Sequence, residues 1–370
     1  MLQSLELDRV FVAERDAQIR EIEAEISKLQ VEEQVAALKD SIPVLHTSKK
    51  LAQQRLDSYK YPVFTLPNEI VSVVFVHFLP TYPEPPRFFG PRSPFTLTHI
   101  CRRWREIALT TPELWRAIHL GFGGETAALL APLWLERSGC LPLSIRVADS
   151  PAELLDFQSI FGALIPHRAR WEQLDLNLYN PKDLEVLDGP LPLLRTLSVY
   201  LDDHLRNPLL LQTVPLLRTA VLDDYGLLGL ILPWSQLTSL TLRVIYSSKC
   251  VPILRQAQNL VSCTLTIYGL HNMPDDWIPV LTLPRLETLV FHRDSISYGT
   301  ELLSFFITPA LRSLEIGEAS VHKKDPIASL NSFILKSGCT LNELRITWAS
   351  IDEVVYRKAF PSIPIVICGF

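Results

Sequence analysis

The most regular feature of the chain is a six-residue pattern with apolar residues at positions 1, 4 and 6. It occurs eight times between residues 171 and 346, and successive copies start 23, 23, 20, 23, 26, 25 and 30 residues apart. The copies start at Trp171, Leu194, Leu217, Leu237, Leu260, Leu286, Leu311 and Leu341. The alternation within each copy predicts a short strand with one buried and one exposed row of side chains. Cys140–Ile145 fits the same pattern and is expected to be an additional first copy.

The repetition also predicts how these strands associate. A single short strand cannot bury its apolar face alone, so neighbouring copies must stack and complete each other's hydrogen bonds. The spacing and the Leu-x-x-Leu-x-Leu cores are similar to leucine-rich repeats, which form curved solenoids. Prolines two residues before four of the copies favour extended entry to a strand: Pro192, Pro215, Pro284 and Pro309. We therefore predict an α/β fold in which residues 121–370 form a leucine-rich-repeat solenoid with a curved parallel sheet.

The residues between the buried positions are expected to face the concave side of that sheet. Concave solenoid surfaces commonly bind partners, so we predict substrate contacts there. The residues chosen lie within or directly after six of the copies, and they are Tyr200, Asp223, Arg243, Thr266, His292 and Arg345. For any single one of them, a solvated strand face without a partner is the competing interpretation.

A helical periodicity precedes the repeats. Apolar residues spaced by three and four predict an amphipathic helix that begins near Pro67 and has Glu69 in its first turn. Its apolar positions are Ile70, Val71, Val74, Phe75 and Phe78. Ser93-Pro94 predicts the start of a second helix, whose stripe is Leu97, Ile100, Trp104 and Ile107. Helices this short are marginal alone and need each other or a partner.

Three strings in this region resemble an F-box, and they occur in the order found in that family. They are Leu66-Pro67-x-Glu69-Ile70, Cys101-Arg102-Arg103-Trp104 and Pro112-x-Leu114-Trp115. An F-box docks on the Skp-type adaptor of cullin ubiquitin ligases. The resemblance implies a module at residues 61–120 that contacts the adaptor through Leu66, Pro67, Ile70, Val74, Phe75 and Trp104. The segment Pro80–Pro91 is longer and richer in proline than the usual connection, and an ordinary helical hairpin is the competing interpretation.

Residues 1–60 have a heptad-like pattern, which predicts a helical segment with a coiled-coil seam. The seam positions are Leu5, Val12, Ile19, Ile22, Ile26 and Leu29, then Val31, Val35, Leu38 and Ile42 after a shift of phase. We expect an interruption near Pro43. The seam of residues 1–42 can serve a homodimer, or the helix can fold back within one chain, and the pattern does not choose between them.

Composition narrows the functional classes. The chain has 370 residues, 48% of them hydrophobic, which fits a globular protein of about two domains. A net charge of −5 gives no electrostatic case for nucleic acid, and no apolar stretch is long enough to span a membrane. Six scattered cysteines fit reduced thiols in the cytoplasm or nucleus, with no metal or cofactor expected.

Catalytic motifs are also missing from the sequence. It contains no His-Glu-x-x-His and no Gly-x-Ser-x-Gly, and we expect no enzyme activity. Cys101 beside two arginines could have a reactive thiol, but its place in the predicted helix favours packing. The resemblance instead implies a substrate-recognition subunit of a Skp–cullin–F-box ubiquitin ligase, linked through the adaptor to a cullin and holding an unknown protein target on the solenoid. The alternative is a leucine-rich-repeat scaffold outside any ligase that self-associates through its N-terminal helix.

Overall fold

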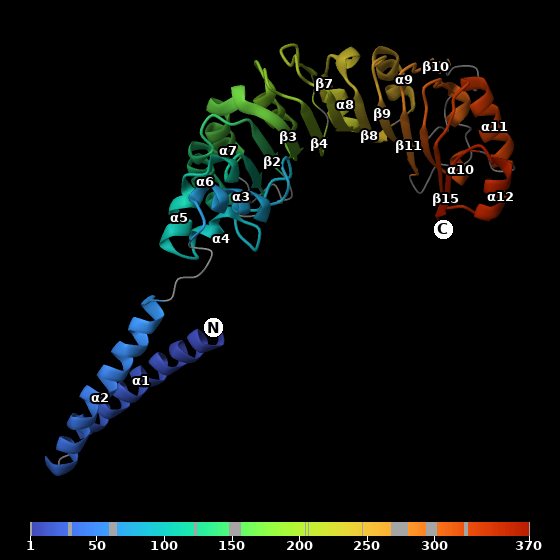
Figure 1. The fold of residues 1–370 in the computed structure, drawn as a ribbon. Helices are drawn as coiled ribbons and strands as arrows, with labels where there is room; N and C mark the ends of the chain where they lie inside the picture. The colour runs from blue at the N-terminus through green and yellow to red at the C-terminus, as the bar shows by residue number, and fades with distance from the viewer. Residues whose placement is uncertain are drawn as a thin grey trace. The chain divides into compact units, whose positions relative to one another are not determined.

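We analysed a computed structural model of the chain (Figure 1). It describes residues 2–28, 32–58, 65–121, 124–147, 157–203, 205, 207–245, 247–267, 280–293, 302–321 and 325–369. The chain divides into two compact units, Met1–Val73 and Val74–Phe370. The division falls inside one helix and not at the expected boundary between residues 60 and 61, so most of the expected 61–120 module belongs to the same unit as the sheet.

The first unit is built on a hairpin of two helices. These are α1 (Leu2–Lys28) and α2 (Glu32–Ser58), and the start of α3 (Asn68–Phe78) completes the unit. Arg55 Nη2 lies 2.9 Å from Asp8 Oδ1, and Lys49 pairs with Asp16, so the two helices run antiparallel. Leu5 and Ile19 of the predicted seam are buried in this hairpin. Leu29, Val31 and the side chain of Val35 lie outside the described part of the chain.

The expected helix break near Pro43 is wrong, because α2 continues through this residue. Proline inside a helix removes one hydrogen bond and costs about 3 kcal/mol or more. Hydroxyl groups bond to main-chain carbonyls in this part of α2: Ser41 Oγ donates to Leu38 O at 2.7 Å, and Thr47 Oγ1 donates to the carbonyl of Pro43 itself at 2.8 Å. Packing against α1 gives α2 stability that a local propensity argument does not count.

The second unit contains a parallel sheet of eleven strands, ordered β1-β2-β3-β4-β6-β8-β9-β11-β13-β14-β15. Their bounds are β1 (Ala117–Leu120), β2 (Leu143–Val147), β3 (Trp171–Leu178), β4 (Thr196–Leu201), β6 (Thr219–Asp223), β8 (Ser239–Ile245), β9 (Ser262–Ile267), β11 (Thr288–Arg293), β13 (Ser313–Gly317), β14 (Glu343–Thr347) and β15 (Ile365–Gly369). The eight copies of the pattern and the additional copy at Cys140 each overlap one of these strands. The mixed α/β class, the N-terminal helices and the large parallel sheet are thereby confirmed.

The register shows why the pattern repeats. Leu174 is aligned with Leu197, Ala220, Leu240 and Cys263 on the successive strands β3, β4, β6, β8 and β9, and all five side chains are buried. Each apolar side chain therefore covers its neighbour on the next strand. The alternate positions point to the opposite side of the sheet. Figure 1 shows that the sheet is curved.

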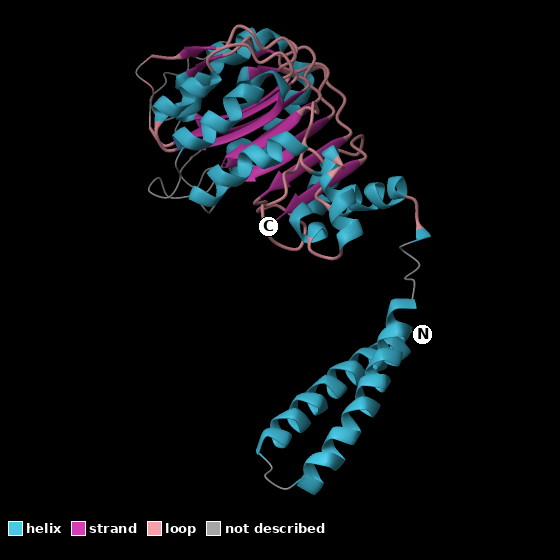
Figure 2. Cartoon of the chain, turned by 90° about the vertical axis from the view of Figure 1, so that its left-hand side faces the viewer, coloured by secondary structure: helices cyan, strands magenta, loops and turns pink. Residues whose placement is uncertain are grey.

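Helices and short paired strands complete the unit. The helices are α4 (Pro94–Thr98), α5 (Arg102–Leu109), α6 (Gly124–Arg137), α7 (Phe157–Leu164), α8 (Asp224–Gly229), α9 (Ser247–Gln256), α10 (Glu318–Val321), α11 (Pro326–Ser337) and α12 (Glu353–Ala359). Two further strand pairs are β5 (Leu209–Leu210) with β7 (Leu230–Ile231), and β10 (Leu281–Thr282) with β12 (Phe306–Ile307). Helices α7, α8, α9 and α11 lie on the outer side of the curved sheet, and the 90° view shows its strands side by side (Figures 1 and 2). The inner face is thus the side of the sheet that these helices leave open.

A tryptophan pair joins the small helices to the sheet. The rings of Trp115, just before β1, and Trp134, on α6, meet edge to face with centroids 5.0 Å apart. Trp115 Nε1 donates to Ala108 O at the end of α5, and Trp134 Nε1 donates to Ala117 O on β1. Both rings are fully buried, so α5, β1 and α6 share one core.

Candidate functional site

Helix α3 has an exposed apolar stripe. Ile70, Val73 and Val74 recur at helical spacing, and Ile70 and Val74 are 49% and 53% exposed. Val71 and Phe75, on the other side of the helix, are buried. Leu66 and Pro67, just before α3, are also exposed, and Pro67 O accepts hydrogen bonds from the N–H groups of Ile70 and Val71. A helix that packs one apolar side against its own fold leaves its other apolar side facing solvent or a partner.

Phe75 has a different environment from the one that the F-box resemblance implies. Phe75 is 1% exposed, and its ring lies 4.9 Å from the ring of Trp104 on α5, centroid to centroid. The expectation that Phe75 contacts a partner directly has to be revised, because its side chain supports the helix from beneath. Trp104 is half-buried.

Cys101 is a helix cap. It precedes α5 in extended backbone conformation, and its Sγ accepts a hydrogen bond from Trp104 N at 3.5 Å. The capping role accounts for a cysteine just before the Arg-Arg-Trp string, and it requires no reactive thiol.

The proline-rich segment Pro80–Pro91 crosses the inner face of the sheet. Tyr82 Oη donates to Glu172 Oε2 on β3 at 2.6 Å, and the Arg116 guanidinium lies 3.7 Å from the Tyr82 ring centroid. Burial first, and then the bond to Glu172, raise the pKa of the Tyr82 hydroxyl. Further along, Arg87 forms a parallel β-bridge with His119 on β1, which protects the edge of the sheet.

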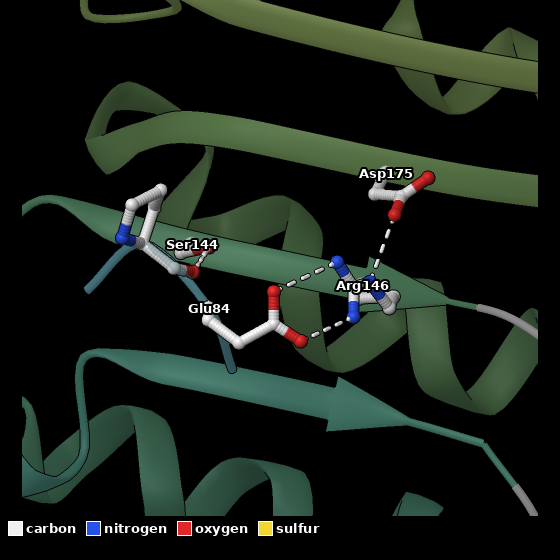
Figure 3. Close-up of polar contacts among 5 residues, drawn as sticks. Glu84, Ser144, Arg146 and Asp175 are labelled. Atoms are coloured by element: carbon white, nitrogen blue, oxygen red, sulfur yellow. Dashed lines mark hydrogen bonds and ion pairs between the residues drawn. The ribbon is translucent and has the colours of Figure 1, made fainter. Parts of the chain in front are cut away.

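Arg146 on β2 joins this segment to the inner face of the sheet (Figure 3). Its Nη1 and Nη2 lie 2.9 and 3.4 Å from the two carboxylate oxygens of Glu84, and its Nε donates to Asp175 Oδ2 on β3 at 2.8 Å. Burial alone lowers the pKa of the Arg146 guanidinium, but the bonds to Glu84 and Asp175 outweigh it and raise the pKa. Bidentate pairing of this kind fixes position as well as charge.

A pocket of about 820 Å³ lies between the proline-rich segment and the sheet. Its floor includes Arg146, Asp175, Ser198, Tyr200 and Arg243, from strands β2, β3, β4 and β8. Its wall includes the exposed side chains of Arg87, Phe89 and Arg92. The size is in the range of ligand-binding pockets.

Two of the predicted substrate-binding residues, Tyr200 and Arg243, line this pocket together. Tyr200 is 47% exposed. Thr266 and His292 are register partners on β9 and β11, beyond the pocket. Arg345 on β14 pairs with Glu343 on its own strand at 2.7 Å. At about 4.8 Å per strand, Arg345 is about 29 Å from Tyr200 along the sheet, so the six residues do not form one site.

Asp223 has a different environment from the one expected. It is 6% exposed, and its carboxylate accepts hydrogen bonds from Gly226 N at 2.7 Å and Leu201 N at 3.2 Å. These bonds cap α8 and fix the end of β4. Burial raises the pKa of this carboxyl, and the two backbone bonds oppose the shift only partly. Because backbone N–H groups occupy the carboxylate, we revise its role from ligand contact to helix cap.

Sequence reasoning missed Arg87, Arg92 and Arg146 as part of the inner surface. Arg146 follows the additional copy of the pattern at an alternating position, a signal that could have identified it. Arg87 and Arg92 lie in an irregular segment whose one distinctive sequence feature is its high proline content, and this feature does not predict which surface the segment covers.

Among the described residues, no group of three or more His, Cys, Asp and Glu side chains could hold a metal ion. Within the same residues, no helix has both the length and the apolar character that a bilayer span needs. Comparison with known proteins assigns no family, because no protein-family model and no curated protein matches the chain.

Proposed function

We propose that the chain is a substrate-recognition subunit of a Skp–cullin–F-box ubiquitin ligase, as the resemblance of residues 66–115 implies. The observation that carries this proposal is the exposed apolar stripe of α3, with Leu66 and Pro67 before it. Exposed apolar side chains in a row at helical spacing fit a helical partner surface. In this proposal the chain acts in the cytoplasm or nucleus and needs no cofactor.

The second part of the proposal is that the sheet is a leucine-rich-repeat solenoid that holds the target. The six-residue pattern overlaps nine of the eleven strands, and its buried positions are in register across neighbouring strands, which supports this part of the proposal. The inner face, which carries polar and aromatic side chains, is the proposed target surface. The ligase would then transfer ubiquitin to a target held nearby, so proximity is the contribution of this chain.

The adaptor assignment is tested by co-purification of the full chain with a Skp-type adaptor. We expect Leu66→Ala/Pro67→Ala, and independently Ile70→Glu/Val74→Glu, to weaken binding at least about 30-fold, since truncating central interface residues costs about 2 kcal/mol or more. Leu335→Glu is the matched control, because Leu335 is an exposed apolar residue on another helix, α11. Unchanged adaptor binding by both double variants, with the fold intact, would refute the assignment.

A further inference from the structure

We propose that the pocket between the proline-rich segment and the inner face binds an acidic, extended peptide segment of the target through Arg87, Arg92 and Arg243. This inference deepens the proposed function, and it rests on that function only in attributing the peptide to a ubiquitination target. The ligand chemistry is that of Asp and Glu carboxylates.

The lining of the pocket is positively charged. Four arginines and two carboxylates line the pocket, which gives it an excess of two positive charges in a chain whose net charge is −5. The two carboxylates, Glu84 and Asp175, are both bonded to Arg146. Among the described residues, Arg87, Arg92 and Arg243 take part in no ion pair. Guanidinium groups bind carboxylates in a bidentate geometry, so these three side chains favour an anionic ligand.

The length of the pocket fits an extended peptide. The pocket floor runs from Arg146 on β2 to Arg243 on β8, which are four strand intervals apart. At about 4.8 Å per interval the floor is about 19 Å long, and an extended peptide at about 3.3 Å per residue covers it with about six residues. Arg87 and Arg92 come from the wall, and Arg243 is at the β8 end of the floor. Acidic residues near both ends of such a peptide would each reach an arginine.

The same pocket also offers apolar contacts. Phe89 is exposed on the wall and Tyr200 on the floor. The wall has a defined position, because Ser144 Oγ donates to Pro83 O and Arg146 bonds to Glu84 (Figure 3). A preformed wall lowers the ordering cost of binding, and exposed aromatic rings contact the backbone and apolar parts of a peptide.

The test is fluorescence anisotropy of the purified full chain with a labelled eight-residue peptide. The probe has two glutamates at each end and serine and glycine between them, and its matched control has glutamine for every glutamate. We expect the glutamine peptide to bind at least about tenfold more weakly, and raising salt from about 0.05 M to about 0.5 M to weaken the glutamate peptide. Equal affinity for the two peptides overturns the proposal. Binding of a phosphoserine version alone overturns the assignment to carboxylates.

Variants locate the site. We expect the triple variant Arg87→Gln/Arg92→Gln/Arg243→Gln to bind the glutamate peptide at least about tenfold more weakly. Arg285→Gln, at an exposed arginine outside the pocket lining, should change the affinity less than about twofold. Asp175→Asn removes a carboxylate from the floor and should tighten binding by about threefold. Unchanged affinity in the triple variant, with circular dichroism showing an intact fold, overturns the site.

Adaptor co-purification of the same variants separates the two proposals. Peptide binding that fails while adaptor capture persists overturns this inference and leaves the proposed function intact. Adaptor capture that fails while peptide binding depends on the three arginines overturns the ligase function and leaves the acidic-peptide site in place.

Discussion

The hydroxyl of Ser144 on β2 donates a 2.6 Å hydrogen bond to the main-chain carbonyl of Pro83. The two residues are 61 positions apart, and Ser144 is buried. The bond makes the proline-rich segment part of the inner surface of the sheet, where it is the wall of the pocket. A connection that looks like an irregular insertion between two helices is therefore a structural part of the candidate target site.

Ser144→Ala tests this relationship. Removing the hydroxyl breaks this partly buried hydrogen bond to the Pro83 carbonyl, so we expect a loss of about 0.5–1.5 kcal/mol in the free energy of unfolding measured in urea. Amide exchange at residues 81–88 should also become faster, because this segment loses one of its bonds to the sheet. Ser262→Ala is a matched control, since Ser262 has the equivalent register position on β9, and it should leave exchange at 81–88 unchanged. Equal effects of the two variants on this segment would contradict the role of Ser144.

Truncation of two neighbouring residues of α3 should affect different properties: stability for Phe75, and adaptor binding for Val74. Phe75 is buried against Trp104, so Phe75→Ala should cost about 3–5 kcal/mol of unfolding free energy through lost packing and a cavity. Val74 is exposed, so Val74→Ala should cost less than about 0.5 kcal/mol while still weakening capture of a Skp-type adaptor. Chemical unfolding and adaptor pull-down of both variants measure this separation. A large stability loss in Val74→Ala would show that the stripe is part of the core.

The pH dependence of stability should reveal the buried carboxyl of Asp223. Burial raises its folded-state pKa above the ordinary value of 3.8, so the folded chain takes up this proton before the unfolded chain does. Protonation of Asp223 therefore stabilises the folded chain, and this contribution grows as the pH falls through the folded-state pKa towards 3.8. Above the folded-state pKa the carboxyl is ionised in both states and the contribution is lost. The unfolding free energy of the natural chain minus that of Asp223→Asn should therefore rise as the pH is lowered from about 7 to about 4. A constant difference would contradict the raised pKa.

Replacing Asp223 by alanine tests the cap itself. The change leaves the buried N–H groups of Leu201 and Gly226 without their acceptor, and we expect a loss of about 1–3 kcal/mol at neutral pH. Asp224→Ala is the adjacent control, because the Asp224 carboxylate pairs instead with the Lys249 ammonium at 2.6 Å. The pair is mostly buried, with the Lys249 and Asp224 side chains 29% and 18% exposed, so its loss should also cost stability. Amide exchange at Leu201 and Gly226 should become faster only in Asp223→Ala, because only that variant removes their acceptor.

The sheet could be predicted from sequence because every copy of the pattern meets the same environment. A parallel stack gives Leu197, Leu240 and Leu314 equivalent buried positions, so alternation within six residues determines which side chains point inward. The same alternation misplaced Asp223, because the chain turns into α8 directly after it and the side chain turns back to cap that helix. The short turn after the strand determines where the Asp223 side chain points, and the alternation within the strand does not predict that turn.

The pocket could not be predicted for a related reason. Pro83, Glu84 and Arg87 reach the sheet through contacts with residues distant in sequence, and the segment that carries them has no periodicity. Prolines exclude a helix there but do not say which surface the segment covers. The stripe of α3, in contrast, follows from helical spacing alone, although spacing did not tell the exposed Val74 from the buried Phe75.

Deleting residues 1–58 tests whether the helical hairpin is independent of the rest. The contacts that join α1 to α2, Asp8 with Arg55 and Asp16 with Lys49, lie within this hairpin, and the sheet belongs to a separate compact unit. We therefore expect calorimetry to show the unfolding transition of the sheet unit within about 2 °C of its value in the full chain. Burial of Leu5 and Ile19 inside the hairpin also uses part of the apolar seam within one chain, so light scattering should give a monomer mass with and without the deletion. A dimer of the full chain that becomes a monomer on deletion would instead support the self-associating scaffold, because the seam would then lie between two copies.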